Sequence, residues 1–441
     1  MSFDKPNGMP TLPPGWMWKT FDQVCDRISV GHVGETNSFF CGKEGVPFLR
    51  SQNVRPGRLD VNDIKYVTKD FHAKSKKSQL TAGDILIVRV GQNRGDCAVV
   101  PAGLGELNCA NIVLAKPNRK YSNYIGYFFN SFLGREALLS LSSGSAQLVL
   151  NTKAIAKVVV PVPPEDVALS IGLFLKTIDD RIALLRETNA TLEAIAQVLF
   201  KSWFVNFDRV HAKQDGRMPE GMVEATEALF PDSFEESELG QVPRGWRVQS
   251  LDEIATYLNG LALQKFPPTE TSWLPVIKIA QLRKGDTVGA DRAGRTIKSE
   301  YIVRDGDVLF SWSGSLEVAI WCGGEGALNQ HLFKVTSDRF PKWFYYLWTK
   351  HHLENFRQIA ASKATTMGHI QRGHLSQARV VVPPDEVIRV FDGLFGSLLE
   401  RSISTILKAK NLAALRDTLL PRLISGQLRP QEAAEKLKEA A

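Results

Sequence analysis

The sequence predicts an α+β fold in which two similar domains are separated by two long antiparallel helices that form a coiled coil with pseudo-twofold symmetry. Motifs of the 441-residue chain recur about 220 to 230 residues apart. Pro13–Trp16 returns as Pro243–Trp246, for example, and Gly83-Asp84 returns as Gly306-Asp307. Solenoid repeats have periods of 20 to 50 residues. The longer period therefore indicates a duplicated domain, and a long stretch with helical periodicity follows each copy.

Each copy is expected to consist of short strands joined by glycine turns, with one helix. The first copy spans residues 12–165 and the second spans 242–386. In the first, strands are expected at Val46–Arg50, Asp84–Val90, Ala98–Pro101, Ile112–Ala115 and Lys157–Val162, with a helix near Tyr124–Leu141. In the second, they are expected at Val276–Ala280, Asp307–Trp312, Val318–Trp321, Leu332–Val335 and Ala378–Val382, with a helix near Lys342–Ile359. Neither copy has the βαβ alternation of a nucleotide-binding fold.

The aromatic residues of both copies are interpreted as core residues. Trp16 and Trp246 follow a Pro-x-Gly turn at the start of each copy, where the indole ring is expected to fill part of the hydrophobic core. Trp343–Trp348 is interpreted as a buried helix face, with a protein-binding surface as the alternative.

The two connecting helices are predicted from heptad periodicity. The central helix, residues 166–208, repeats apolar residues in an unbroken 4-3 alternation, with one polar residue in the seam. Its seam comprises Ile171, Leu175, Ile178, Ile182, Leu185, Asn189, Leu192 and Leu199. The distal helix, residues 387–428, is less regular and is expected to end at Pro421 and Gly426. It contributes Phe391, Phe395, Leu412 and Leu419, while Ser402 and Thr405 occupy the strict register.

Three other segments complete the predicted organisation. These are an N-terminal tail (1–11), an acidic linker (209–241) with a short helix around Met222–Leu229, and a C-terminal tail (429–441). The net charge of +7 is concentrated in the two copies, which favours a polyanionic partner. No apolar run reaches the length of a membrane span, and the N-terminus does not resemble a signal peptide. The five cysteines form no C-x-x-C pair, which fits reduced thiols in a cytoplasmic protein.

The sequence carries no recognisable catalytic, metal or cofactor signature. It has no G-x-x-x-x-G-K-[ST] phosphate loop, no G-x-S-x-G elbow and no H-E-x-x-H. Asp84, Asp307 and Asp385 are interpreted as turn formers that accept backbone hydrogen bonds. We therefore expect no active site, no metal and no small-molecule substrate.

Side chains suited to DNA gather instead in the predicted loops of both copies. Arg and Lys match guanine edges and phosphates, and Asn and Gln match adenine edges. Their recurrence at corresponding positions favours binding over a purely solvated surface. In the first copy they are Arg50, Gln52, Asn53, Arg55, Lys74, Lys76, Lys77, Arg89, Gln92, Asn93 and Arg94. In the second they are Lys278, Gln281, Arg283, Ser313, Ser315, Thr365, Thr366, His369, Gln371 and Arg372.

Taken together, these motifs resemble the specificity subunit of type I restriction–modification systems over residues 12–428. The resemblance lies in the Pro-x-Gly-Trp entrances, the Gly-Asp strands, the exits at Val160–Pro164 and Val380–Pro384, the connector Glu220–Gly240 and the ending Leu419–Gly426. It implies a non-catalytic subunit in which each copy reads one half of a split DNA site. The helices would set the gap and dock two modification subunits, which methylate adenine N6, together with restriction subunits. S-adenosylmethionine, ATP and Mg²⁺ would belong to those partners.

Two other functions remain open from the residues alone. One is a protein–protein adaptor that uses the coiled coil without reading DNA. The other is a stand-alone nuclease or methyltransferase, which would require the catalytic motifs that are absent here.

Overall fold

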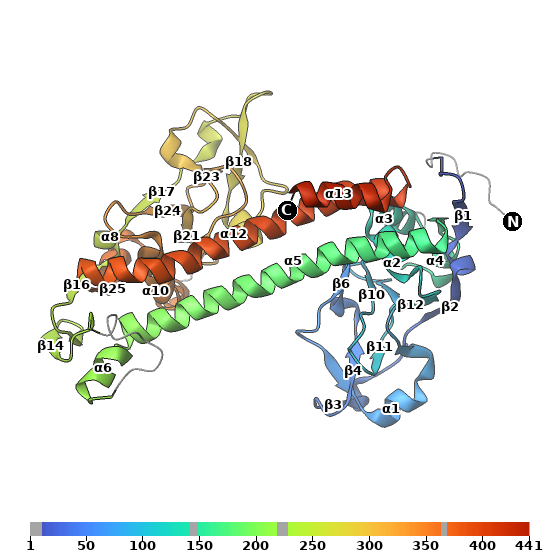
Figure 1. The fold of residues 1–441 in the computed structure, drawn as a ribbon, viewed down its shortest axis with the longest axis horizontal. Helices are drawn as coiled ribbons and strands as arrows, with labels where there is room; N and C mark the ends of the chain where they lie inside the picture. Colours follow the sequence, from blue (N-terminus) through green and yellow to red (C-terminus); the bar gives the residue numbers. More distant parts are fainter. Residues whose placement is uncertain (1–10, 142–148, 218–227, 363–367, 441) are drawn as a thin grey trace. The chain divides into compact units, whose positions relative to one another are not determined.

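The computed structural model describes residues 11–141, 149–217, 228–362 and 368–440 (Figure 1). The chain divides into two compact units. Unit 1 comprises residues 1–183 and 410–441, and unit 2 comprises residues 184–409. Each unit therefore contains one copy of the repeat, the beginning of the helix that follows it, and the end of the other long helix. The short helix predicted around Met222–Leu229 falls largely outside the described residues.

The first copy is built on two sheets. The first sheet has the order β10-β9-β12-β2 and is antiparallel: β2 (Cys25–Val30), β9 (Ile85–Ile87), β10 (Cys97–Val99) and β12 (Val113–Pro117). The second has the order β3-β7-β4-β11-β8 and one parallel pair, β4 with β11: β3 (Phe40–Cys41), β4 (Val46–Leu49), β7 (Lys65–Val67), β8 (Gln79–Leu80) and β11 (Leu107–Cys109). Two small ribbons complete it: β1 (Met17–Thr20) with β13 (Val159–Val162), and β5 (Val54–Arg55) with β6 (Arg58–Leu59).

The second copy repeats most of this topology, with four strands instead of five in its second sheet. Its antiparallel sheet has the order β17-β24-β21-β22: β17 (Thr256–Asn259), β21 (Val308–Ser311), β22 (Glu317–Ile320) and β24 (Leu332–Thr336). The other sheet has the order β19-β18-β23-β20, again with one parallel pair: β18 (Trp273–Ile277), β19 (Arg292–Gly294), β20 (Ile302–Val303) and β23 (Gly326–Leu328). Ribbons β14 (Phe234–Ser237) with β15 (Gly240–Pro243) and β16 (Arg247–Ser250) with β25 (Arg379–Val382) flank it. The predicted α+β class is confirmed.

The helix expected near Tyr124–Leu141 is in fact two helices, α2 (Ser122–Asn130) and α3 (Phe132–Ser140). Ser131 separates them: its hydroxyl donates to the Phe128 carbonyl and accepts from the Gly134 N–H, which caps α3. Apolar periodicity continues across the break, so the pattern alone did not reveal it. The corresponding α10 (Lys342–Ser362) is a single helix, and Trp343–Trp348 is buried in it, as expected.

Shorter helices fill the connections. In the first copy these are α1 (Lys69–Lys74) and α4 (Thr152–Ala156). In unit 2 they are α6 (Asp208–Gln214), α8 (Leu251–Ile254), α9 (Ile279–Lys284) and α11 (Arg372–Gln377). The predicted linker is therefore partly structured, and its Phe230 is buried against Trp203 and Trp246.

The two long helices are α5 (Glu165–Phe200), which continues as a π-helical turn over Lys201–Val205, and α12 (Asp385–Ile424). Pro421 lies inside α12 and does not end it, contrary to the prediction. The helix stops at Ile424, before Gly426 with φ of +72°. Residues expected to form a C-terminal tail form α13 (Pro430–Ala440) instead, and Ala433 joins the unit 1 core.

Each copy is anchored to the helices in the same way. In unit 1, Ile171 and Leu175 at the start of α5 and Leu423 and Ile424 at the end of α12 share one core with the first copy. In unit 2, Phe391 and Phe395 at the start of α12 and Phe200 and Phe204 at the end of α5 share one core with the second copy. Trp246 is buried there, whereas Trp16 is half-buried and meets Tyr124 edge-on.

Candidate nucleic-acid interface and helix pair

The loop after β4 holds three of the residues predicted to contact DNA, and its geometry gives them structural partners. The Arg50 guanidinium donates to the Asp63 carboxylate at 3.1 Å, and the Gln52 amide donates to the same carboxylate at 2.6 Å. Asn53 is only 2% exposed. Its Oδ1 accepts the Arg50 N–H at 2.9 Å, and its Nδ2 donates to the Asp60 carbonyl at 2.9 Å. Both ends of this amide are therefore occupied within the loop.

The loop after β18 repeats two of these contacts. Lys278 pairs with Asp291 at 2.5 Å, as Arg50 pairs with Asp63. Gln281 is 8% exposed, and its Oε1 accepts the Lys278 N–H at 3.3 Å. Asn53 and Gln281 thus close their loops, and their predicted contact with DNA stays a prediction. Buried polar groups must be hydrogen-bonded. The recurrence of a hydrogen-bonded amide at this position of both loops therefore indicates a framework that the two copies share.

The predicted lysines lie on and just after α1. Lys74, Lys76 and Lys77 are exposed, and Lys74 pairs with Asp70 at 2.7 Å, four residues earlier in the helix. Exposed pairs of this kind contribute little to stability. Because all three lysines are exposed, their ammonium groups are accessible to a phosphate backbone.

The loop after β9 carries the next predicted group. Gln92 is exposed, while Arg89, Asn93 and Arg94 are half-buried. Arg89 Nη1 donates to Asn111 Oδ1 at 3.3 Å. In the second copy, the loop after β21 buries Ser313, whose hydroxyl lies 3.0 Å from His331 Nδ1.

The remaining predicted residues are mostly at the surface. Arg55 is half-buried, and the exposed ones are Arg283, Ser315, His369, Gln371 and Arg372. The Arg372 guanidinium lies 5.9 Å from the Phe333 ring centroid, and His369 meets Trp312 edge-on. Thr365 and Thr366 lie outside the described residues.

The predicted turn-forming role of Asp84 and Asp307 is confirmed. Asp84 accepts the Thr81 N–H at 2.8 Å and pairs with Lys116 at 2.5 Å. Asp307 accepts the Arg304 N–H at 2.8 Å and pairs with Lys334 at 2.8 Å. Within the described residues, no group of His, Cys, Asp and Glu side chains is placed to hold a metal ion. No described helix is long and apolar enough to cross a membrane.

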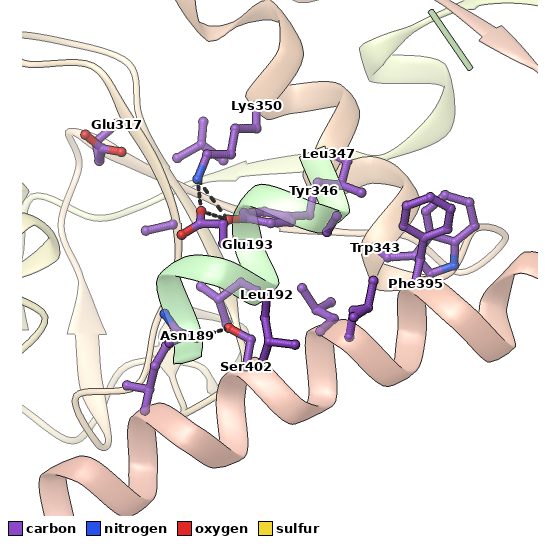
Figure 2. Close-up of a pocket in the computed structure, with 17 residues that line it drawn as sticks. Asn189, Leu192, Glu193, Glu317, Trp343, Tyr346, Leu347, Lys350, Phe395 and Ser402 are labelled. Atoms are coloured by element: carbon purple, nitrogen blue, oxygen red, sulfur yellow. Dashed lines mark hydrogen bonds and ion pairs between the residues drawn. The ribbon is translucent and has the colours of Figure 1, made fainter. Parts of the chain in front are cut away.

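In unit 2, polar contacts join the helix pair to the second copy (Figure 2). Asn189 of α5, the polar residue of the heptad seam, accepts a hydrogen bond from Ser402 of α12. One turn further along α5, the Glu193 carboxylate accepts hydrogen bonds from Tyr346 Oη at 3.0 Å and from the Lys350 ammonium, both on α10. Burial and the nearby Glu193 carboxylate raise the pKa of Tyr346, so the phenol remains a proton donor. A cavity of about 230 Å³ lies beside these contacts.

In unit 1, a different set of side chains joins the helices. The Asp179 carboxylate of α5 pairs with Arg416 of α12 at 2.5 Å and accepts from Tyr127 Oη of α2 at 2.6 Å. Burial raises the pKa of Tyr127, and the Asp179 carboxylate raises it further. Residue numbers rise along α5 while the numbers of the residues that it contacts on α12 fall. The two helices therefore run antiparallel, as predicted.

Sequence reasoning missed these carboxylates and their partners. Asp179 and Glu193 directly follow the seam residues Ile178 and Leu192, so acidic residues beside the seam were a usable signal. Their partners are up to 237 residues away in the sequence, and nothing local identifies them.

Comparison with known proteins matches this architecture. Residues 13–194 and 243–412 match the family described as type I restriction modification DNA specificity domain, and the chain belongs to that family. It is 25% identical to the type I restriction enzyme MjaIX specificity subunit of Methanocaldococcus jannaschii, covering 70% of each chain. It is 23% identical to the HindI specificity subunit of Haemophilus influenzae, covering 87% of this chain and 94% of that one.

A solved structure shares the fold. The S subunit of a type I restriction-modification system from M. genitalium aligns with a TM-score of 0.53 at 13% identity, covering 96% of this chain and 98% of that chain. The relatives are specificity subunits, and the catalytic activities of such systems lie in other subunits. This chain is accordingly a recognition subunit.

Proposed function

We propose that each copy reads one half of a bipartite, asymmetric double-stranded DNA site, and that the helix pair sets the gap between the halves. The observation that carries this proposal is the repetition of one strand order in two units, each joined to both long helices. Equal frameworks present two sets of loops, and the loops differ in their polar side chains. Two such readers on one chain suit a split site of unequal halves.

The chemistry of attachment follows from the loop residues. Exposed lysines such as Lys76 and Lys77 neutralise phosphates, which gives salt-dependent binding that is blind to sequence. Base-edge contacts then discriminate, at about 1–3 kcal/mol for each good bidentate pair.

The partners complete the enzyme. The helix pair would dock two modification subunits, which bind S-adenosylmethionine and methylate adenine N6, and restriction subunits, which use ATP and Mg²⁺. Methylation of a base within a duplex requires it to be flipped out of the stack, so the reader holds the DNA while the partner acts. The complex works in the cytoplasm, and this chain needs no cofactor of its own.

The direct test is a map of N6-methyladenine in the source genome with and without this gene. A split motif that disappears on deletion supports the proposal. An unchanged methylation pattern, in cells that express intact partner subunits, contradicts it.

A gel shift on duplex DNA separates this proposal from the adaptor alternative. Affinity that falls steeply with salt favours a reader, whereas no DNA binding even with modification subunits favours an adaptor. Purified chain incubated with DNA and either Mg²⁺ or S-adenosylmethionine should give no turnover.

A further inference from the structure

A further inference rests on the proposed function and concerns which side chains meet the bases. The two copies can be superposed through backbone hydrogen bonds rather than through side-chain similarity. The carbonyl of Arg89, after β9, accepts the Leu150 N–H at 3.0 Å, and the carbonyl of Trp312, after β21, accepts the Ile370 N–H at 2.9 Å. Arg89 and Trp312 therefore occupy equivalent backbone positions.

The connection that precedes β12 or β24 can be matched in the same way. The Asn111 N–H donates to the His32 carbonyl at 2.8 Å, and the Gln330 N–H donates to the Leu261 carbonyl at 2.9 Å. Asn111 and Gln330 are thus equivalent, and each presents a carboxamide. Asn111 has a φ of +21°, which a non-glycine residue rarely adopts.

The next contact reveals an insertion in the second copy. Gly31 donates to the Ile112 carbonyl at 2.8 Å, and Gly260 donates to the Leu332 carbonyl at 3.0 Å. Ile112 directly follows Asn111, whereas one further residue, His331, lies between Gln330 and Leu332. Added β-carbons at Gly31 and Gly260 would lie 2.6 Å and 2.2 Å from backbone oxygens, so both loops depend on glycine here.

The side chains on these matched positions form different clusters. In the first copy, Arg89 donates to Asn111. The buried Arg89 Nε has no hydrogen-bond partner among the described residues. In the second copy, the Trp312 and His331 rings lie 5.9 Å apart. Trp312 Nε1 also donates to Asn259 at 3.0 Å.

His331 is held by its neighbours on both ring nitrogens. Its Nδ1 lies 3.0 Å from the Ser313 hydroxyl, and its Nε2 lies 3.4 Å from Gln330 Nε2. Trp312, Gln330 and His331 are all half-buried. The cluster is therefore ordered by protein contacts while it retains access to solvent.

Arg89 and Trp312 differ from the loop-closing pairs in how far their side-chain chemistry is kept between the two copies. Arg50 with Asp63 and Lys278 with Asp291 keep the same chemistry at matched positions, as a shared framework requires. Arg89 and Trp312 share a backbone position but differ completely in chemistry. Two readers of different sequences need such changed side chains on a shared framework. Asn111 and Gln330 keep the carboxamide but differ in their partners: Asn111 accepts from Arg89, whereas Gln330 contacts the inserted His331.

We propose that Arg89 with Asn111 in the first copy, and Trp312 with Gln330 and His331 in the second, are specificity-determining residues. The Arg89 guanidinium fits guanine O6 and N7, and the Gln330 carboxamide fits adenine N6 and N7. The Trp312 ring provides an apolar surface beside His331. Each cluster reads its own half of the split site.

The test uses the full chain in complex with the modification subunits of its own system and a library of randomised DNA duplexes. Bound duplexes are sequenced for the wild type and for Arg89→Ala and Gln330→Ala. Arg89→Ala is expected to lower the preference for guanine at one position of one half-site about tenfold. Gln330→Ala is expected to do the same for adenine at one position of the other half-site.

Lys76→Ala is the control, because an exposed lysine contacts phosphate. It should weaken binding without changing the enriched motif. Arg89→Lys keeps the charge but loses the planar fork, so it should still relax the guanine position.

The outcomes are distinguishable. If both alanine variants enrich the complete wild-type motif, the inference is overturned while the proposed function stands. If either variant loses every position of its half-site, the residue supports the fold instead, which also overturns the inference. If the wild type enriches no split motif, the proposed function itself fails.

Discussion

Units 1 and 2 share one topology but attach it to the helices through different chemistry. In unit 1 the carboxylate of Asp179 joins α5 to α12 through Arg416, with Tyr127 as a second donor. In unit 2 the carboxylate of Glu193 joins α5 to α10 through Lys350 and Tyr346. The strand order is retained because backbone pairing tolerates many side chains. The attachments can differ because any carboxylate on α5 whose hydrogen bonds are satisfied can join that helix to its neighbours.

The two cores also differ in composition. Unit 2 surrounds Phe204 with Trp246, Trp343, Phe391 and Phe395. The corresponding end of α12 in unit 1 is aliphatic, and its Ile424 carbonyl accepts from Tyr124 Oη at 3.3 Å. Unit 2 therefore concentrates more of its packing in a few large rings.

The largest expected effect breaks this aromatic core. Phe204 is fully buried, so Phe204→Ala should lower the free energy of unfolding of unit 2 by about 3–5 kcal/mol. Scanning calorimetry would register this as a lower transition temperature. Val198→Ala, at a position 67% exposed on the same helix, is the control and should change little. Equal effects of the two substitutions would contradict the role of Phe204.

A smaller effect is expected when the attachments are cut. Glu193→Ala leaves the Lys350 ammonium, only 22% exposed, without its carboxylate, which should cost about 1–3 kcal/mol. Asp179→Ala should cost less, because Arg416 keeps a second pair with Asp417 at 2.7 Å. Denaturant titration of both variants measures the difference, and a greater loss for Asp179→Ala would reverse the comparison.

Acid should weaken unit 2 through His352, whose neutral ring donates its Nε2–H to the Arg379 carbonyl at 2.9 Å. Burial is the main cause that lowers the pKa of His352 to about 4. Because the unfolded chain, with an ordinary histidine pKa near 6.5, binds this proton more readily, stability falls as pH drops from about 6.5 towards 4. We expect a loss of roughly 1–2 kcal/mol between pH 7 and pH 5 from this group. Urea titrations at both pH values should show a smaller loss in His352→Gln, and an identical loss would refute the assignment.

The smallest effect concerns the polar contact in the helix seam. Asn189→Ala removes the hydrogen bond from Ser402 and should cost about 1 kcal/mol. The half-buried Asn189 amide in the seam should also fix register, so duplexes bound by the variant should show a wider range of gaps. Library selection measures this, and an unchanged gap distribution would mean that other contacts fix the register.

Much of the fold could be predicted from patterns within the sequence. The heptads of α5 are unbroken over many turns, and the duplicated motifs reinforce each other. The α+β fold class and the pair of long helices could therefore be predicted. The split at Ser131 was not, because a single capping hydroxyl interrupts an apolar pattern that continues. Nor was the passage of α12 through Pro421, which an exposed position tolerates.

The site was harder to predict, for a physical reason. Residue type and recurrence selected Arg50, Asn53, Lys278 and Gln281, but recurrence also marks a shared framework. Asn111 and Gln330 escaped notice because they are single carboxamides in short connections. Their equivalence depends on backbone hydrogen bonds to His32 and Leu261, which are remote in sequence.

In the proposed function, the helices measure the gap while the two copies read the sequence. The most direct measurement removes one heptad from each helix, residues 182–188 of α5 and 405–411 of α12, and maps adenine methylation by the resulting complex. Each helix is shortened by about 10 Å. Both half-site sequences should be unchanged, with a shorter gap between them. An altered half-site sequence, or the original gap, would contradict it.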